Sequence, residues 1–344
     1  MANTRIAILG AGSLGTIMGA VVSKNGGECV LIDANKEHVD TLNEKGASVT
    51  GYLDLKNIPV KAITPDQMEG IYDVVIVLLK QTANKAALTN LLKYLGEDSV
   101  VCTLQNGIPE EMVAEIVGAH RTIGGTVGWG AGWAGPGVAQ LYTKPEHMRI
   151  EIGSIDGQIT DGVKKVEEFL KFAGDVDVNT NLIGIRWAKL LMNSALSGMS
   201  AALGCTFGDV IDDDVAVACA AHVADELIRV AKAKGVKMEV IVPDHDFLEL
   251  EFNDKKGRDH AIAFLREMYD VHRPQKASMM QDMEKGLPCE IDYINGIVCQ
   301  NGETFGIETP FNDIIVKTVK AFEAKEIPFP TMENLKYFSV PELH

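Results

Sequence analysis

Three polar patterns in the second half of the chain combine residue types that can perform acid–base chemistry. Lys189 and Asn193 are four residues apart, so a helix would place them on one face, and Ser278 and Asp282 repeat that spacing. Glu290 follows shortly afterwards. A lysine in an apolar stretch is unusual because burying an ammonium group is costly. Such an ammonium could stabilise an oxyanion and deliver a proton, while a nearby carboxylate would keep it charged.

A second candidate site lies near the N-terminus, between an apolar run at 5–9 and a helical pattern at 14–23. The spacing G-x-G-x-x-G occurs there in the residues Gly10, Ala11, Gly12, Ser13, Leu14 and Gly15. The first glycine allows a tight turn, the second lets a pyrophosphate approach the backbone, and the third lets helix and strand pack closely. Phosphates are favoured at the N-terminus of the helix that follows. We therefore predict a dinucleotide-binding turn rather than an ordinary glycine turn.

The type of dinucleotide depends on Asp33, which ends the next apolar run. A carboxylate there can accept hydrogen bonds from the ribose hydroxyls of NAD, and it would repel the 2′-phosphate of NADP. At about 4 Å and an effective dielectric constant near 20, one such charge pair costs on the order of 4 kcal/mol. We favour NADH, with NADPH as the alternative if Lys36 contacts the phosphate. Asp33 could instead simply cap the helix that starts near Lys36.

Strand and helix patterns alternate through the first half of the chain, which predicts an α/β fold with a doubly wound, Rossmann-type sheet over residues 1–180. The expected strands are 5–9, 29–33, 74–79 and 99–104, and the expected helices are 14–23, 35–45 and 82–95. The run at 74–79 is apolar throughout, as in a strand buried on both faces. We interpret Gly124–Gly137 as a bend region followed by short antiparallel strands near 138–141 and 148–152.

From about residue 182 helical patterns dominate, so a C-terminal all-α domain is expected over residues 181–344. The expected helices are 187–203, 213–233, 260–269, 277–285 and 291–304. The cleft between the two domains is the expected place for cofactor and substrate.

Composition excludes several classes of function. The 344 residues carry a formal net charge of -16, which disfavours nucleic acid and anionic membrane surfaces as partners. The six cysteines lack disulfide or zinc spacing, and Asp244-His245-Asp246 is expected to be a solvated loop, so we expect no metal. Met1–Arg5 does not resemble a signal peptide, and no apolar run reaches transmembrane length. A cytoplasmic protein with reduced thiols is expected.

Six motifs spread over nearly the whole chain give a resemblance to a known family. They are the glycine-rich turn, Leu79-Lys80-Gln81, Gln105-Asn106-Gly107, W-x-K-L-x-x-N, S-M-x-Q-D and E-I-D-Y-I-N-G. In this order they make the sequence resemble the ketopantoate reductases (2-dehydropantoate 2-reductases) and the related NAD-dependent D-2-hydroxyacid dehydrogenases. The resemblance implies NAD(P)H-dependent reduction of a small anionic 2-oxo acid to a D-2-hydroxy acid, by default 2-dehydropantoate (ketopantoate) to pantoate.

The resemblance also implies roles for single residues. Lys189 matches the catalytic lysine that protonates the developing alkoxide, and Glu290 matches a glutamate that binds substrate and sets the environment of the lysine. Asn193 and Ser278 match substrate-binding residues, with Ser278 near the substrate carboxylate. Without the family motifs, Lys189 could be a surface lysine and Glu290 an acidic residue favoured at a helix start.

Two further matches concern the cofactor. Asn106 matches a residue where nicotinamide and substrate meet, so it is expected to contact both. Lys80 matches a lysine in the cofactor cleft, although it could equally just close a strand. A homodimer is one assembly that the helical domain could support by analogy.

The sequence also departs from the ketopantoate enzymes. A second asparagine usually lies four residues beyond Asn193, where this chain has the shorter Ser197, also expected to bind substrate. Asp33 replaces a commonly basic residue, and the segment 236–275 is longer than usual. These departures favour an NAD-dependent enzyme acting on other branched or aromatic 2-oxo acids. A non-catalytic NAD-sensing protein on the same fold is the alternative of another class; it is expected to lack the lysine or the glutamate, and both are present here. A dehydrogenase of the opine or 6-phosphogluconate type would need its own motifs in the second domain, and this sequence does not have them.

Overall fold

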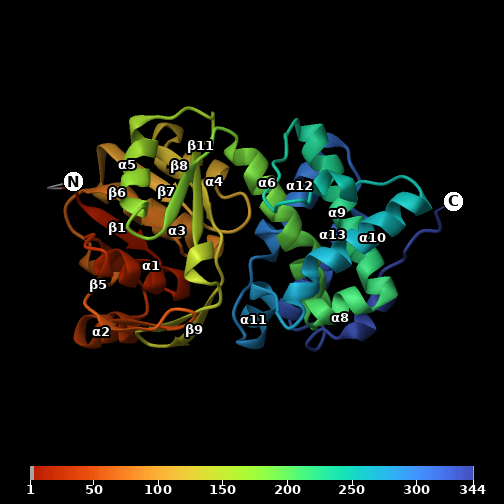
Figure 1. Ribbon diagram of the computed structural model, residues 1–344, viewed down its shortest axis with the longest axis horizontal. Helices are drawn as coiled ribbons and strands as arrows, with labels where there is room; N and C mark the ends of the chain where they lie inside the picture. Colours follow the sequence, from red (N-terminus) through yellow and green to blue (C-terminus); the bar gives the residue numbers. More distant parts are fainter. Residues whose placement is uncertain (1–3, 344) are drawn as a thin grey trace. The chain divides into compact units, whose positions relative to one another are not determined.

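The computed structural model describes residues 4–343, and the chain divides into two compact units (Figure 1). Met1–Asn3, the start of the segment in which no signal peptide is expected, and His344 lie outside the described residues. The sheet unit comprises residues 4–105 and Pro109–Leu182, and the helical unit comprises Asn106–Ile108 and residues 183–343. In Figure 1 the sheet unit runs from red to yellow-green, and the helical unit from green to blue.

The main sheet has eight strands in the order β12-β11-β8-β7-β6-β1-β2-β5. Its strands are β1 (Ile6–Leu9), β2 (Val30–Ile32), β5 (Lys61–Ile63), β6 (Tyr72–Val77), β7 (Leu95–Thr103), β8 (Thr122–Val127), β11 (Arg149–Ser154) and β12 (Asp175–Val178). The six strands from β5 to β8 are all parallel, and only the β8–β11 pair is antiparallel. The strand order reverses direction at β1, between β2 and β6, which confirms the predicted doubly wound sheet.

Both faces of this sheet are buried, as the apolar run at 74–79 predicted. Val74 and Ile76 belong to one core and Val75 and Val77 to another, because successive side chains of a strand point to opposite faces. Helices α1 and α5 contribute to the first core, and helices α3 and α4 to the second. The helices of this unit are α1 (Ser13–Lys24), α2 (Lys36–Lys45), α3 (Asn84–Leu91), α4 (Glu110–Val117) and α5 (Asp161–Leu170).

Two interpretations of the sheet unit were wrong in detail. The predicted helix at 82–95 is shorter, because Leu95 already begins β7 and pairs with Tyr72 of β6. The glycine-rich region at 124–137 is not simply a bend, since its first residues lie in the buried strand β8. Its later residues form β9, in a second sheet with the order β4-β3-β10-β9. The strands of that sheet are β3 (Ala47–Gly51), β4 (Leu55–Ile58), β9 (Ala131–Gly135) and β10 (Val138–Leu141).

The helical unit is built around one large apolar core that contains Trp187 and the alanine-rich face of α9. Its helices are α6 (Leu182–Met192), α7 (Gly198–Leu203), α8 (Phe207–Asp212), α9 (Asp214–Lys234), α10 (Lys255–Tyr269), α11 (Ser278–Glu284), α12 (Asn295–Phe305) and α13 (Pro310–Glu323). The predicted helix at 187–203 is therefore interrupted. Between α6 and α7 the residues Asn193–Ser197 form a π-helical turn, hereafter the π turn.

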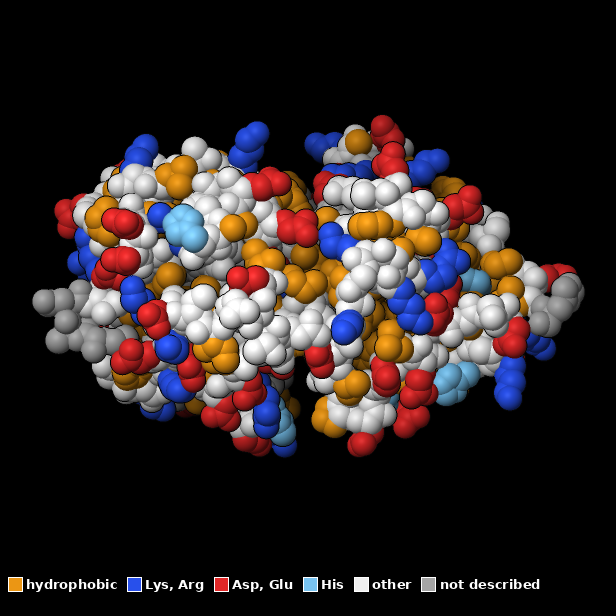
Figure 2. All heavy atoms as spheres, turned by 90° about the horizontal axis from the view of Figure 1, so that it is seen from above, with side chains coloured by type: hydrophobic (Ala, Val, Ile, Leu, Met, Phe, Trp, Pro, Cys, Tyr) orange, Lys and Arg blue, Asp and Glu red, His pale blue; other side chains and the backbone are white. Residues whose placement is uncertain are grey.

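Figure 2 shows acidic and basic side chains interspersed over the visible face of each unit, with apolar side chains between them, some of them in small groups. Within residues 4–343, no helix combines the length and the hydrophobicity that a membrane span requires.

Candidate functional site

The carboxyl ends of four parallel strands bring the N-terminal candidate residues to one edge of the sheet. Leu9 of β1 is level with Ile32 of β2 and with Val77 of β6, and Val77 is level with Thr103 of β7. The segments that follow these strands contain Gly10, Asp33, Lys80 and Asn106, so they leave the sheet along the same edge. Ligands of open α/β sheets bind at this edge, beside the position where the strand order reverses.

The three glycines of the turn have the space that their predicted roles require. Gly10 has a positive φ of 103°, and a Cβ there would lie 2.5 Å from the amide nitrogen of Leu79. A Cβ on Gly15 would lie 2.1 Å from the carbonyl oxygen of Gly10. Gly12, by contrast, has no atom of the described residues within 4 Å of its Cβ position. Gly10 and Gly15 are therefore required by packing, whereas Gly12 leaves open space at the N-terminus of α1.

A buried histidine that the sequence analysis missed holds this turn in place. His38 of α2 lies with its Nε2 2.7 Å from the carbonyl oxygen of Ala11. The amide of Gly137 donates to Nδ1 at 2.9 Å, so Nε2 carries the proton and donates to Ala11. Thr16 also donates its hydroxyl to that carbonyl, at 2.7 Å. The Ala11 carbonyl is thus turned inward, because two side chains bind it there.

Asp33 lies beside the turn, but it does not cap α2. Gly10 donates its amide to the carbonyl of Ile32 at 2.8 Å, which fixes the end of β2 against the turn. The N-cap of α2 is Asn35, whose side chain accepts from the amide of His38. Asp33 accepts from the amide of Asn35 at 2.9 Å. The alternative in which Asp33 merely caps the helix was therefore wrong.

Lys36, the residue considered as a contact for a 2′-phosphate, is engaged elsewhere. Its Nζ lies 2.7 Å from a carboxylate oxygen of Asp40, one turn along α2, and both side chains are exposed. An exposed pair of this kind contributes little to stability and can separate readily.

The buried side chain of Gln105 holds the loop that contains Lys80 in place. Its side-chain amide donates to the carbonyl of Leu79 at 2.6 Å and to Asn84 at 2.7 Å, and its oxygen accepts from Thr103 at 2.9 Å. Gln105 therefore explains why the motif Gln105-Asn106-Gly107 accompanies Leu79-Lys80-Gln81. Lys80 is exposed and Asn106 is half-buried.

In the helical unit, the three polar candidates on α6 and the π turn share one face. Lys189, Asn193 and Ser197 are half-buried, whereas Leu190, Leu191 and the residues 194–196 between them are fully buried. Lys189 lies in the last turn of α6, and Asn193 and Ser197 are the first and last residues of the π turn. Lys189, Asn193 and Ser197 are thus half-buried polar side chains on a segment that is otherwise mostly buried.

Two hydrogen bonds connect the segments that follow α6, the π turn and α7, to the other predicted segments. Ala277, the residue before Ser278, donates its amide to the hydroxyl of Ser200 on α7 at 3.4 Å. Asn295, five residues after Glu290, donates its side-chain amide to the carbonyl of Ser194 in the π turn at 3.1 Å. Ser278 is exposed as the first residue of α11, and Glu290 is only 4% exposed. The three motifs of the second half therefore meet around the π turn.

Two residues outside the predicted set support the same turn. Tyr269 donates its hydroxyl to the carbonyl of Met192 at 3.1 Å, and burial raises the pKa of this phenol, which keeps it a neutral donor. Asn295 belongs to the quoted motif E-I-D-Y-I-N-G, which was the signal available in the sequence. Tyr269 gave no signal, because nothing local relates it to Met192.

The acidic, cysteine and histidine residues are also candidate metal ligands. In the part of the chain that the structure describes, no three His, Cys, Asp or Glu side chains are arranged to hold an ion. Asp246 instead caps a short 3-10 turn by accepting from the amide of Leu248.

Two family models match the chain. The model described as "Ketopantoate reductase PanE/ApbA" matches residues 6–157, and the model described as "Ketopantoate reductase PanE/ApbA C terminal" matches residues 181–323. Among curated relatives, a 2-dehydropantoate 2-reductase of Pyrococcus horikoshii is 30% identical over 322 residues, covering 93% of this chain and 98% of the relative.

Solved structures share the fold over nearly the whole chain. A D-mandelate dehydrogenase solved with NADH and anilino(oxo)acetate has a TM-score of 0.80 at 24% identity, covering 94% of this chain and 99% of that one. A PanE/ApbA family ketopantoate reductase from Ralstonia eutropha JMP134 has a TM-score of 0.78 at 25% identity, with the same coverage.

Proposed function

Because the chain belongs to the ketopantoate reductase family, we propose that it reduces the keto group of a small anionic 2-oxo acid to a D-2-hydroxy acid. Ketopantoate is the default substrate and pantoate the product. The assignment depends most on one observation, the half-buried row of Lys189, Asn193 and Ser197 on a segment whose other side chains are almost all buried. An ammonium and two hydrogen-bonding groups in line can orient a polar substrate against an apolar helix.

The proposed chemistry follows from charge development on the substrate oxygen. Hydride addition to a ketone makes an alkoxide, and Lys189 stabilises that charge and donates the proton. Glu290, almost fully buried in the same unit, keeps the lysine environment anionic, which favours the ammonium form. Asn193, Ser197 and Ser278 bind the polar groups of the substrate, with Ser278 nearest its carboxylate.

The N-terminal turn fits a nicotinamide dinucleotide. The open space beside Gly12 at the start of α1 is where a pyrophosphate would approach, and a Cβ there would fill it. Lys80 and Asn106 complete the proposed cofactor-binding set. When bound, the reduced cofactor supplies the hydride. We favour NADH because Asp33 presents a carboxylate where the adenosine ribose is expected; NADPH is the alternative.

A second candidate is an NAD-dependent D-2-hydroxyacid dehydrogenase for branched or aromatic 2-oxo acids. Ser197 is the observation that favours it, because a shorter side chain in the polar row leaves room for a bulkier substrate. Asp33 points the same way, toward NADH.

The test is an absorbance assay at the nicotinamide band. NADH and NADPH are each combined with ketopantoate and with a panel of branched and aromatic 2-oxo acids. The proposal predicts turnover with at least one acid and faster turnover with NADH. No oxidation of either cofactor with any acid would contradict it, and would favour a non-catalytic NAD-binding protein if the cofactor still bound.

Location and assembly follow as smaller proposals. All six cysteines are free thiols, and burial raises the pKa of Cys29, Cys205, Cys219 and Cys289 to about 12, so they are poorly reactive. Such thiols fit the reducing cytoplasm. A homodimer is the proposed assembly, and light scattering of the purified protein tests it.

A further inference from the structure

The π turn departs from α-helical hydrogen bonding in a way that leaves one carbonyl needing a donor. In an α-helix the amide of Gly198 would donate to the carbonyl of Ser194, four residues earlier. Here that amide donates to the carbonyls of Asn193 and Ala195. The carbonyl of Ser194 receives the side-chain amide of Asn295 instead, at 3.1 Å. A side chain from α12 thus takes the place of a backbone donor within the π turn.

Asn295 is fitted tightly into this position. It is 0% exposed, and a Cβ added to Gly198 would lie 2.6 Å from its Oδ1, so only glycine leaves room for it. Its Nδ2 also donates to Oδ1 of Asn312 at 2.9 Å. Within residues 4–343, Oδ1 of Asn295 has no hydrogen-bond partner. A buried amide with an unsatisfied oxygen is costly, so its presence calls for a compensating role.

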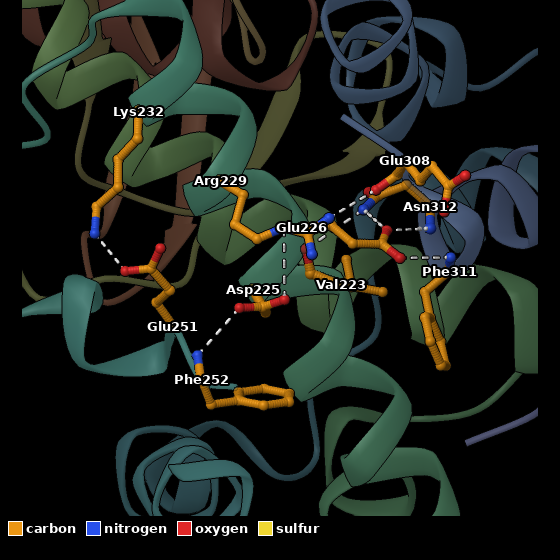
Figure 3. A network of polar contacts seen from close by, with 10 residues as sticks. All are labelled: Val223, Asp225, Glu226, Arg229, Lys232, Glu251, Phe252, Glu308, Phe311 and Asn312. Carbon is orange, nitrogen blue, oxygen red and sulfur yellow. Dashed lines mark hydrogen bonds and ion pairs between the residues drawn. The ribbon is translucent and has the colours of Figure 1, made fainter. Parts of the chain in front are cut away.

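The other end of this chain of hydrogen bonds is Glu226 of α9 (Figure 3). Its carboxylate accepts from the backbone amides of Phe311 and Asn312 at the start of α13, at 2.8 Å and 3.0 Å, and from the Asn312 side chain at 2.8 Å. Asn312 therefore cannot turn away from Asn295 without losing its bond to Glu226. The path Glu226–Asn312–Asn295–Ser194 ties α9, α13, α12 and the π turn together.

We propose that Asn295 is a positioning residue for the reaction, because its side chain holds the π turn in the register that aligns Asn193 and Ser197 with Lys189. This inference rests on the proposed function. In a continuous α-helix, residues four apart are rotated by about 40° and residues eight apart by about 80° around the axis. The wider π turn at Asn193–Ser197 reduces this offset. Returning the turn to α-helical bonding would therefore rotate Asn193 and Ser197 relative to each other and to Lys189, and so bend the row.

The test is the substitution Asn295→Leu, which nearly keeps the volume and removes both donated bonds. The matched control is Asn301→Leu on the same helix, where the side chain donates to the carbonyl of Ile297 and accepts from Lys234 of α9, so this variant also loses two hydrogen bonds, none of them to the π turn. With the best 2-oxo acid and its cofactor, we expect Asn295→Leu to raise KM for the acid about tenfold, equivalent to about 1.4 kcal/mol, while KM for the cofactor stays within twofold. Asn301→Leu should leave both within twofold.

A double-mutant cycle with Asn193→Ala separates positioning from general destabilisation. If Asn295 acts through the π turn, its substitution adds little once the Asn193 side chain is gone. The inference would be overturned if the two substitutions raised KM for the acid independently, so that their effects multiplied in the double variant. It would also be overturned if KM for the acid in Asn295→Leu stayed within twofold of wild type. Both outcomes would leave the proposed function intact. A wild-type enzyme that reduces no acid would overturn both.

A second variant covers the case in which Asn295→Leu does not fold. Gly198→Ala pushes on Oδ1 of Asn295 from the opposite side and leaves α12 unchanged. The same selective rise in KM for the acid is expected. Unchanged kinetics in a folded Gly198→Ala enzyme would also overturn the inference.

Discussion

The candidate site of the sheet unit is formed mainly by backbone groups, whereas that of the helical unit is formed by side chains. In the sheet unit the site consists of a glycine turn, a helix N-terminus and the ends of strands. The buried side chains of His38 and Gln105 hold this backbone by binding the carbonyls of Ala11 and Leu79. In the helical unit it is made of side chains in a row on a helix, and the helix itself is locally distorted. The backbone site requires open space beside the glycine turn for a ligand to approach. The side-chain site requires the π turn to hold its side chains in the right directions.

The helical unit also buries two titratable groups whose pKa values are strongly displaced. Both groups lie on α9. Burial raises the pKa of Glu226 to about 7 and lowers the pKa of His222 to about 4. His222 is stacked on the ring of Phe311, with the ring centroids 4.5 Å apart. The comparison predicts that changes in the helical unit alter turnover and pH dependence, while changes in the sheet unit alter cofactor binding.

Lys189 aside, the largest effect is expected at Glu290. In the proposed function, Glu290 favours the charged form of Lys189, so replacing its carboxylate by glutamine should lower kcat/KM for the 2-oxo acid about 100-fold. The cofactor dissociation constant, measured by nicotinamide fluorescence, should stay within twofold. Glu303→Gln on the exposed side of α12 is the control and should be neutral. Equal losses in substrate and cofactor binding would break the proposed division between the units.

Next comes the pH dependence of stability at Glu226. Its pKa is about 7 in the folded protein, against 4.5 for a glutamate that nothing perturbs, so the folded state keeps a proton that the unfolded state has lost. The stabilisation is complete below pH 4.5 and is lost as the pH rises to 7. Relative to Glu226→Gln, the wild type should lose on the order of 3 kcal/mol of unfolding free energy over that range.

Urea denaturation at several pH values measures this difference. His222 and the adjacent carboxyl Asp225, whose pKa burial raises, contribute their own pH dependence. Both are present in the two proteins, so their contributions cancel in the comparison. A wild-type-minus-variant difference that does not change with pH would show that Glu226 is charged in the folded protein.

A smaller effect is expected from Gly12→Ala in the sheet unit. The space around its Cβ position is open, so the melting temperature should stay near that of the wild type. The cofactor dissociation constant should rise about tenfold, because the methyl group occupies the space that a pyrophosphate needs. Gly15→Ala is the contrast, since its Cβ would collide with the Gly10 carbonyl and should lower the melting temperature as well. Unaltered cofactor affinity in Gly12→Ala would place the dinucleotide elsewhere.

The smallest effect is expected at Asp33. Asp33→Asn removes the charge that opposes a 2′-phosphate, so the preference for NADH over NADPH should fall several-fold, equivalent to about 1 kcal/mol. The ratio of kcat/KM for the two cofactors measures it. If the ratio is unchanged, Asp33 does not contact the ribose.

The sequence predicted the features that repeat along the chain and missed those that depend on distant partners. Strand ends, the glycine turn and the polar spacing of Lys189 and Asn193 are local patterns. The strand β8 was missed because glycines usually mark bends; here Cβ atoms on Gly124 and Gly125 would strike Glu110 and the carbonyl of Glu151.

The π turn could not be predicted for a related reason. Its residues Asn193–Ser197 have ordinary helical character, and the donors that support it come from Tyr269 and Asn295, 77 and 101 residues from the carbonyls that they bind. Local patterns in one sequence do not reveal contacts between residues so far apart in the chain. The motif that contains Asn295 was visible, but its role was not.

The role proposed for Lys189 is tested most directly by the turnover of Lys189→Ala with and without added methylammonium. At saturating cofactor, we expect a fall in kcat of about 1,000-fold, unchanged cofactor affinity, and partial recovery of turnover as methylammonium supplies the missing acid. A folded Lys189→Ala enzyme that turns over at nearly the wild-type rate would contradict it.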